Sequence, residues 1–363
     1  MFGGIWDNTY KHIQRTLRPL RAPGVPYSRL GEDDESGPAT VEVGPLQHKH
    51  AMASLLGNLT RQRRVLLAVL SLAFILLFGY ISNLSPDLGT FAISRLPDAN
   101  DRPLIIYMYH ETPNSHRNAA FFLAHGLHDG ADFVFVMNGE SSLPAEIPFG
   151  AHITIIRRNN TCFDLGAYGE VLASNGLAQR YQRFILMNSS IRGPFLPTWS
   201  DQCWSDAYLN KVNDTNKLVG MTANCKPWGR SIRPHLQSMI LATDRTGISI
   251  LLNGVISQCF TKHEDAVQGE MNITTAITTA GYTVSAFMTA FSQDAGGYMH
   301  HCEHDDVLYE DHYYGMSLHP YETMFQKANR DINPLQLKLL TEWHDRSGYS
   351  SQPVCGRGSK GRR

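Results

Sequence analysis

A polar triplet, Asn188, Ser189 and Ser190, directly follows a short, mostly apolar run over Tyr181–Met187. The run has the length and composition of a buried strand, and a glycine-proline pair turns the chain soon afterwards. In open α/β sheets, ligands bind at the carboxyl ends of the strands. The amide of Asn188 and the hydroxyl of Ser190 are therefore candidates for ligand binding.

A second candidate is a helix start upstream of that strand. The segment LGAYGEVLASNGL predicts an amphipathic helix, with Asp164 or Gly166 at its N-terminal cap and Gly176 at its end. A helix N-terminus presents unpaired N–H groups and a partial positive charge, which favour a phosphate, and Arg158 adds a full charge beside it. Alternatively, Asp164 is only a cap and Arg158 is solvated.

Metal-capable side chains are densest in the segment 300–312, HHCEHDDVLYEDH, which includes Asp305 and Asp306. Closely spaced His, Asp and Glu side chains bind zinc or manganese. The segment lacks a defined ligand spacing such as His-Glu-x-x-His, so a solvated loop is the alternative.

The later segment HPYETMFQKANR, residues 319–330, carries Glu322, Lys327 and Arg330 at helix-like spacings. Such spacings predict that the three side chains lie near one face of a helix. From spacing alone, an ordinary charged helix is the alternative.

The sequence predicts that these residues are positioned by the strands and helices of an α/β fold. Short runs that are apolar on both faces, separated by a helical spacer at 119–128, are typical of a parallel sheet covered by helices. The predicted strands are 104–109, 133–137, 152–156 and 184–187.

The N-terminal part predicts a membrane anchor. Residues 65–81 form an uncharged apolar run at the short limit for a membrane-spanning helix, and Arg61, Arg63 and Arg64 precede it. Because basic residues stay on the cytosolic side, residues 1–64 are expected to be a disordered cytosolic tail. A short stem, 82–102, would lead to a lumenal domain over 103–345 and a disordered tail over 346–363. The short span favours the Golgi or ER membrane, with single-pass type II topology.

Composition and cysteines agree with this topology. The net charge of −1 argues against a nucleic-acid partner. All six cysteines follow the predicted anchor, so an oxidising compartment would allow up to three disulfides, with the pairing left open. Asn213, in the polar segment KVNDTNK, is the best candidate for an N-linked glycan.

A family resemblance rests on six segments in order: RRNNTCFDLGAYGEVL, YQRFILMNSSIRGPFLPTW, LVGMT, RPHLQSMIL, EMNITTAITTAGY and HPYETMFQKANR. In order and rough spacing, this set resembles the glycosyltransferases of the rhamnan-synthesis F family, over about residues 104–332. The resemblance implies a GT-A-like, Rossmann-like transferase whose first half binds a nucleotide-sugar donor and whose second half forms the acceptor side.

On the donor side, the resemblance places Asp164, Gly166 and Tyr168 near the nucleotide. It also aligns Asn188 with the strand end where related GT-A enzymes carry an Asp-x-Asp motif for a divalent metal, manganese or magnesium. An amide and two hydroxyls are poor ligands for a hard dication. Two possibilities remain open: other acids supply the metal site, or cations replace the metal at the diphosphate. The candidate cations are Arg158, Lys327 and Arg330.

On the acceptor side, the resemblance makes Glu270 the candidate general base that deprotonates an acceptor hydroxyl, a role that suits a carboxylate with a raised pKa. An exposed glutamate near a helix start is the alternative. His235 and Gln237 match a His-x-Gln-Ser segment of the family and would bind sugar hydroxyls together with Glu322, although a buried, satisfied histidine competes with this role.

The sequence thus favours a membrane-anchored hexosyl- or deoxyhexosyltransferase that moves a sugar from a nucleotide-sugar donor to a glycan or glycoconjugate acceptor in the secretory pathway. A second hypothesis keeps the fold without catalysis, as a glycan-binding or scaffolding protein, because the Asp-x-Asp carboxylates are replaced. The third and least favoured is a metal-dependent hydrolase that uses the segment 300–312.

Overall fold

The computed structural model describes residues 69–71, 102–225, 233–291, 306–330 and 332–355. The chain divides into two units, Met1–Ile75 and Leu76–Arg363. In the first unit, residues 69–71 are helical and exposed. The rest of the predicted 65–81 span and the predicted tail 1–64 lie outside the described residues. Among the residues that are described, no helix is both long enough and apolar enough to cross a membrane.

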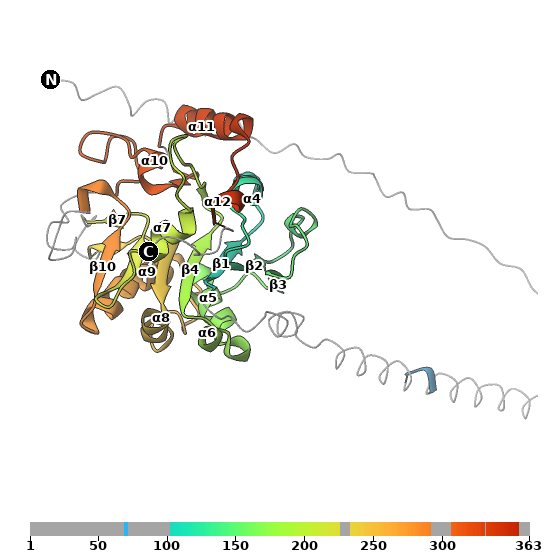
Figure 1. Ribbon diagram of the computed structural model, residues 1–363. Helices are drawn as coiled ribbons and strands as arrows, with labels where there is room; N and C mark the ends of the chain where they lie inside the picture. The colour runs from blue at the N-terminus through green and yellow to red at the C-terminus, as the bar shows by residue number, and fades with distance from the viewer. Residues whose placement is uncertain (1–68, 72–101, 226–232, 292–305, 331, 356–363) are drawn as a thin grey trace, which may run out of the picture. The chain divides into compact units, whose positions relative to one another are not determined.

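The second unit is built on a seven-stranded sheet with the order β10-β6-β9-β4-β1-β2-β3 (Figure 1). Neighbouring strands are parallel except that β9 is antiparallel to both β4 and β6. The predicted α/β class with a mostly parallel sheet is confirmed. Each predicted strand is present, 104–109 with the predicted ends and the other three with ends shifted by one or two residues. The strands are β1 (Leu104–Tyr109), β2 (Asp132–Asn138), β3 (Ile153–Arg158), β4 (Arg183–Asn188), β6 (Asn216–Gly220), β9 (Ile240–Asp244) and β10 (Thr283–Ala286).

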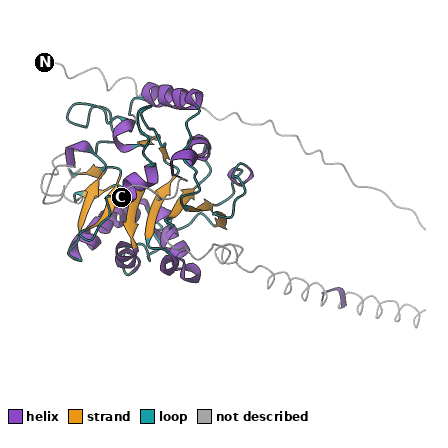
Figure 2. Ribbon diagram, viewed as in Figure 1, coloured by secondary structure: helices purple, strands orange, loops and turns teal. Residues whose placement is uncertain are grey.

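Helices cover both faces of this sheet, which is why the central strands are apolar throughout (Figure 2). Side chains alternate along β1: Ile106 packs into one core cluster and Ile105 into the other. The first cluster includes side chains from α5 (Phe163–Ala173), α6 (Leu177–Arg180), α8 (Arg245–Leu252) and α9 (His263–Thr279). The second includes side chains from α4 (Pro113–His125), α7 (Trp204–Leu209) and α12 (Gln352–Cys355).

Two small ribbons lie outside the main sheet. β5 (Ile191–Arg192) pairs antiparallel with β11 (Gln326–Lys327), and β7 (Ala223–Asn224) pairs antiparallel with β8 (His235–Leu236). The remaining elements are the 3-10 turns η1 (Leu143–Ala145), η2 (Ser174–Gly176) and η3 (Thr289–Phe291), with α10 (Pro320–Thr323) and α11 (Pro334–Ser347).

The segment 319–330 does not form the predicted helix. It makes one helical turn, α10, which ends at Met324 with a φ of 62°. It then becomes strand β11, because its backbone pairs with β5 and Ala328 N–H donates to the carbonyl of Ser190. The expectation that Glu322, Lys327 and Arg330 share one helix face is therefore wrong.

Disulfides hold the unit together and correct its C-terminal boundary. Cys162 is bonded to Cys259 and Cys203 to Cys355, Cys225 is also disulfide-bonded, and Cys302 lies outside the described residues. The predicted disordered tail from residue 346 is wrong as far as residue 355, because α12 packs on α7 and is linked to it covalently.

Candidate active site

One edge of the sheet gathers most of the predicted site residues. The registers Met108↔Asn188, Met187↔Ile240 and Gly220↔Leu241 place the carboxyl ends of β1, β4 and β6, and the start of β9, at the same edge. The turns and loops that follow or precede these strands therefore meet there, as expected for a ligand site in an open α/β sheet.

A chain of hydrogen bonds crosses this edge. Asn188 Nδ2 donates to Asp164 Oδ2 at 2.9 Å, and Ser190 Oγ donates to Asn188 Oδ1 at 2.6 Å. Lys327 Nζ, which comes from β11, donates to Ser190 Oγ at 3.5 Å. The chain links a carboxylate, an amide, a hydroxyl and an ammonium that are far apart in sequence.

Asp164 is positioned by unusual backbone geometry. Cys162 and Phe163, directly before it, both have positive φ values, 68° and 51°, which non-glycine residues rarely adopt. The disulfide from Cys162 to Cys259 fixes this turn at the start of α5. The same turn leaves the Phe163 ring 42% exposed beside Asp164.

Glu270, on α9, forms a second group with residues next to β9. Its Oε1 accepts hydrogen bonds from Ser238 N–H and Ser238 Oγ, both at 2.6 Å. Its Oε2 lies 3.7 Å from His235 Nε2. His235 Nδ1 lies 2.6 Å from the carbonyl of Arg233, so Nδ1 carries a proton and Nε2 faces the carboxylate.

Gln237 forms a third group. Thr222 Oγ1 donates to Gln237 Oε1 at 2.7 Å, and Gln237 Nε2 donates to Asp306 Oδ1 at 3.0 Å. Gln237 and Asp306 are both buried. Both ends of the Gln237 amide are therefore engaged within the protein.

The charges of the three groups influence one another. Burial raises the pKa of Asp164, opposed by the Asn188 hydrogen bond and the charge of Lys327. Burial alone would raise the pKa of Glu270, but the contacts with His235 and Ser238 outweigh it and lower that pKa. Burial lowers the pKa of Lys327 even though Glu270, Asp306 and Asp164 oppose the change. One ammonium thus shares its surroundings with three carboxylates.

The pKa of His235 moves in the opposite direction to that of an ordinary buried histidine. Burial alone would lower it, but the nearby Glu270 carboxylate and the Arg233 carbonyl, which accepts from Nδ1, outweigh burial and raise it. His235 and Glu270 therefore favour the imidazolium–carboxylate form of the pair.

Four predicted donor residues, Arg158, Gly166, Tyr168 and Arg330, have no hydrogen bond to this network. Arg158 binds Glu170, Asn138 and the Thr161 carbonyl, so its guanidinium fixes the turn between β3 and α5. A side chain at Gly166 would place its Cβ 2.6 Å from the Gln258 carbonyl, so this glycine permits close packing of α5.

Tyr168 is fully buried in the core, and among the described residues its hydroxyl has no hydrogen-bond partner. Glu322 accepts hydrogen bonds from Tyr313 Oη and Thr289 N–H, both at 2.6 Å. Arg330 lies over the Tyr309 ring and donates to its hydroxyl at 2.8 Å. None of the three has a hydrogen bond to the groups described above.

The end of β4 does not fit a divalent metal. The Asn188 oxygen already accepts hydrogen bonds from Ser190, its nitrogen donates to Asp164, and the Lys327 ammonium contacts Ser190. The amide and hydroxyl that stand where related enzymes carry Asp-x-Asp carboxylates are thus engaged with one another, and such groups are poor ligands for a hard dication. Residues 300–305, Asp305 included, lie outside the described residues, whereas Asp306 Oδ1 accepts hydrogen bonds from Gln237 Nε2 and Leu308 N–H.

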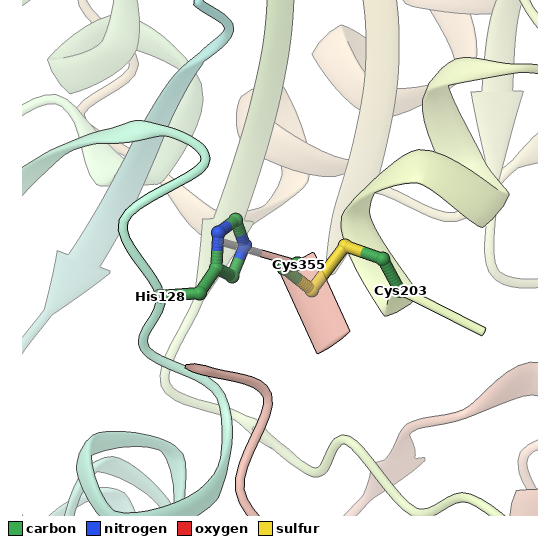
Figure 3. Close-up of side chains that lie close together, drawn as sticks. All are labelled: His128, Cys203 and Cys355. Carbon is green, nitrogen blue, oxygen red and sulfur yellow. A yellow bond between two sulfur atoms is a disulfide. The ribbon is translucent and has the colours of Figure 1, made fainter. Parts of the chain in front are cut away.

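Within the described part of the chain, the one cluster with metal-ligand spacing is His128, Cys203 and Cys355 (Figure 3). The two cysteines form a disulfide and so have no thiolate to offer. His128 Nδ1 accepts from Gly130 N–H, so Nε2 carries the proton and donates to Ser205 Oγ at 3.1 Å. No ligand atom of this cluster is free for a metal.

Sequence reasoning missed four contributors: His110, Phe163, Thr222 and Ser238. His110 directly follows β1 and acts electrostatically on Asp164. The rule that selected Asn188, a polar residue at the end of a strand, would also have found His110. Nothing in the sequence pattern shows that Ser238 reaches Glu270.

Comparisons with known proteins give a likeness at the level of fold. No family model and no curated protein matches the chain. Two crystal structures of the glycosyltransferase GlyE from Streptococcus pneumoniae TIGR4 match with 10% and 11% identity and TM-scores of 0.35 and 0.37. The match covers 69% of this chain in both cases, and 66% and 65% of GlyE, slightly less than two thirds of its length.

A putative glucose-1-phosphate thymidylyltransferase from Bacillus anthracis matches with 10% identity and a TM-score of 0.32, over 50% of this chain and 85% of that one. Likenesses at these identities and TM-scores assign no activity to this chain.

Proposed function

We propose that this protein is a glycosyltransferase that moves a sugar from a nucleotide-sugar donor to a hydroxyl group of a glycan or glycoconjugate acceptor. The observation that carries the proposal is the hydrogen-bonded chain from Lys327 through Ser190 and Asn188 to Asp164 at the carboxyl edge of the sheet, where Glu270 and Asp306 also act electrostatically on Lys327. A cation among carboxylates at this edge suits a reaction that releases a nucleoside diphosphate and deprotonates a hydroxyl group. The order of sequence motifs supports the same reaction class.

Lys327 would stabilise the leaving diphosphate. Charge builds on the leaving oxygen as the sugar–phosphate bond breaks, and a preorganised cation in a partly closed site stabilises that charge. Lys327 is half-buried and held by Ser190 through the β5–β11 ribbon, so its position is set before the donor binds. This arrangement supplies the positive charge where the end of β4 offers no metal ligands.

Two carboxylates are placed to act on the acceptor, and their pKa values are moved in opposite directions. Asp164, with its raised pKa, is the better match for a general base, because a base works best when its pKa approaches the working pH. Glu270 has a lowered pKa and two hydrogen bonds on Oε1, so it remains ionised and holds His235. The sequence-based assignment of the base to Glu270 remains a prediction, and the direction of its pKa shift favours Asp164.

We place the enzyme in the Golgi or ER membrane, anchored through residues 65–81 with its α/β unit in the lumen. Two findings support the lumenal side: the disulfides, and the exposed side chain of Asn213 in its sequon. The test is expression of the full chain in cells, followed by glycosidase and protease treatment of sealed microsomes. Loss of a glycan after Asn213→Gln, with protection of the α/β unit, is expected; a protease-accessible, unglycosylated unit would overturn this placement.

The donor is tested by thermal unfolding of the full chain in detergent, with nucleoside diphosphates and nucleotide sugars, each with and without manganese. A ligand at one hundred times its Kd should stabilise the folded state by about 2.7 kcal/mol. We expect one nucleotide class to raise the Tm without a requirement for manganese. The Tm shift should shrink in Lys327→Met and persist in Lys262→Met, which changes an exposed lysine at the start of α9.

A non-catalytic glycan-binding protein is the second candidate. The observation that favours it is the complete internal engagement of Asn188, which leaves no metal ligands at this position. A folded protein that shows no Tm shift with any nucleotide, but binds glycans, would establish this candidate in place of the transferase.

A further inference from the structure

A basic cleft of about 570 Å³ lies beside the candidate active site, between the β5–β11 ribbon and α11. Its volume falls within the range of small-molecule sites. The described residues that line it include four cations, Arg117, Arg192, Arg330 and Lys338, but only one carboxylate, Glu342. That carboxylate lies 3.9 Å from Lys338, and Asp331 lies outside the described residues. The described lining thus carries a clear surplus of positive charge.

Arg192 is the most informative of these cations because it is only 8% exposed. Its Nε donates to Asn118 Oδ1 at 2.9 Å and its Nη1 to Thr341 Oγ1 at 3.2 Å, and both partners are neutral. No carboxylate of the described chain forms an ion pair with it. Buried charges in proteins are normally paired, so an unpaired guanidinium in the wall of a cleft indicates that the partner is a bound anion.

The cleft is physically connected to the candidate active site. Asn118 accepts from Arg192 and donates through Nδ2 to the carbonyl of Ser189 at 2.9 Å. Ser189 lies between Asn188 and Ser190, which form the hydrogen-bonded chain to Lys327. One residue, Asn118, therefore links Arg192 to the segment that carries Asn188 and Ser190.

The number of positive charges indicates the kind of anion. A carboxylate brings one negative charge and two oxygens, whereas a phosphate monoester carries about −1.5 to −2 charges at pH 7 and three strong acceptor oxygens. Arginine side chains bind phosphate in a bidentate manner, and here three arginines line one cleft. A phosphate monoester is the better match.

We propose that this cleft is an acceptor subsite that binds the phosphate group of a phosphorylated sugar. The assignment to the acceptor rests on the transferase function proposed above, whereas the binding of the phosphate does not. The two are separable, because phosphate binding is measurable without any donor.

The experiment is isothermal titration of the full chain in detergent with glucose 6-phosphate, glucuronate, glucose and inorganic phosphate. These probes separate phosphate from carboxylate and the sugar from the bare ion. We expect glucose 6-phosphate to bind most tightly, glucose not to bind, and affinity to fall as salt is raised. Tighter binding of glucuronate, or equal binding of inorganic phosphate, would overturn the phosphosugar assignment.

The variant Arg117→Gln/Lys338→Gln removes two exposed cations of the cleft and should weaken glucose 6-phosphate binding about tenfold or more. The matched control, Arg157→Gln/Lys262→Gln, removes the same charge from exposed positions that do not line the cleft and should bind as the unchanged protein does. Equal affinity in both variants would show that the cleft is not the site.

A final titration distinguishes acceptor from donor. Glucose 6-phosphate and the nucleotide identified by the Tm screen should bind together, each with unchanged affinity. Mutual exclusion would make the cleft part of the donor site and overturn the acceptor assignment. If the protein binds the phosphosugar but no nucleotide, the phosphate site is supported and the transferase function is rejected.

Discussion

Two buried histidines, His235 and His128, stand in opposite electrostatic situations. His235 is 3% exposed and faces the carboxylate of Glu270, and its pKa is raised. His128 is 1% exposed, lies against Phe133 and Trp204, and contacts the hydroxyl of Ser205 beside a disulfide (Figure 3). Burial, assisted by the positive charge of Arg102, lowers the pKa of His128 to about 3.

The difference shows that burial alone does not make a functional histidine. Around His128 every ring nitrogen is satisfied by a neutral group, so the ring stays neutral and acts as part of the core. Around His235 a charged partner outweighs the desolvation and keeps the site polar.

Removing the disulfide beside His128 should have the largest effect on stability. The double variant Cys203→Ser/Cys355→Ser opens a link across 152 residues and should lower the free energy of unfolding by roughly 2–5 kcal/mol. Chemical denaturation of the full chain measures this. If the cluster of His128, Cys203 and Cys355 is only structural, nucleotide affinity at denaturant concentrations below the unfolding transition should not change. A parallel loss of affinity would mean that the cluster contributes to the candidate active site.

Lys327→Met should have the largest effect on the reaction. Loss of one preorganised group that stabilises developing charge lowers the rate by about 100- to 1,000-fold. The transfer rate with the donor identified by the Tm screen gives the measurement, and the unfolding free energy shows that the fold is kept. Lys262→Met is the control, and a variant as active as the unchanged protein would remove Lys327 from the mechanism.

His128→Gln should change how stability depends on pH. The folded pKa of His128 is about 3 and its unfolded value about 6.5, so the unfolded chain gains a proton first as pH falls. The free energy of unfolding of the unchanged protein, relative to that of the variant, should therefore fall by about 1.4 kcal/mol for each unit by which the pH is lowered below 6.5. Urea unfolding between pH 7 and pH 5 measures this; two parallel stability curves would contradict the neutral, buried imidazole.

His235→Gln should give the opposite and smaller pH dependence. A raised folded pKa contributes stability below the unfolded value of 6.5, and the contribution is lost as pH rises through the folded value. Because 23% of the Glu270 side chain is exposed, we expect at most about 1 kcal/mol. Urea unfolding at pH 6 and pH 9 is the measurement, and a relative stability that grows with pH would reject the ion pair.

Local patterns predicted the sheet well because strands buried on both faces are apolar throughout. The runs at 104–109 and 184–187 fit this pattern and pair as the adjacent parallel strands β1 and β4. The segment 319–330 was mispredicted because its spacing suits a helix, whereas a partner distant in sequence, β5, makes it a strand. The ordered chain to Cys355 was missed because its stability depends on a disulfide to Cys203.

Within the candidate site, the sequence predicted Asp164 at a helix start and Asn188 at a strand end, whereas it selected Lys327 from the spacing of a helix that the chain does not form. It did not show that the Arg158 guanidinium would form its hydrogen bonds within the protein, around the β3–α5 turn, or that Tyr168 would be buried in the core. It also gave the wrong sign for the pKa of Glu270, since that sign depends on His235 and Ser238.

The sequence by itself determined the fold class, the polar ends of the strands and the cysteines available for pairing, because these depend on local composition and periodicity. Only the tertiary structure decided which charges meet. Asp164, Glu270, Asp306 and Lys327 come from four separate segments, and their pKa values depend on burial and on distances of a few ångströms. The same holds for Arg192, which forms no ion pair with any described carboxylate, because whether a charge has a partner is a property of the packed chain.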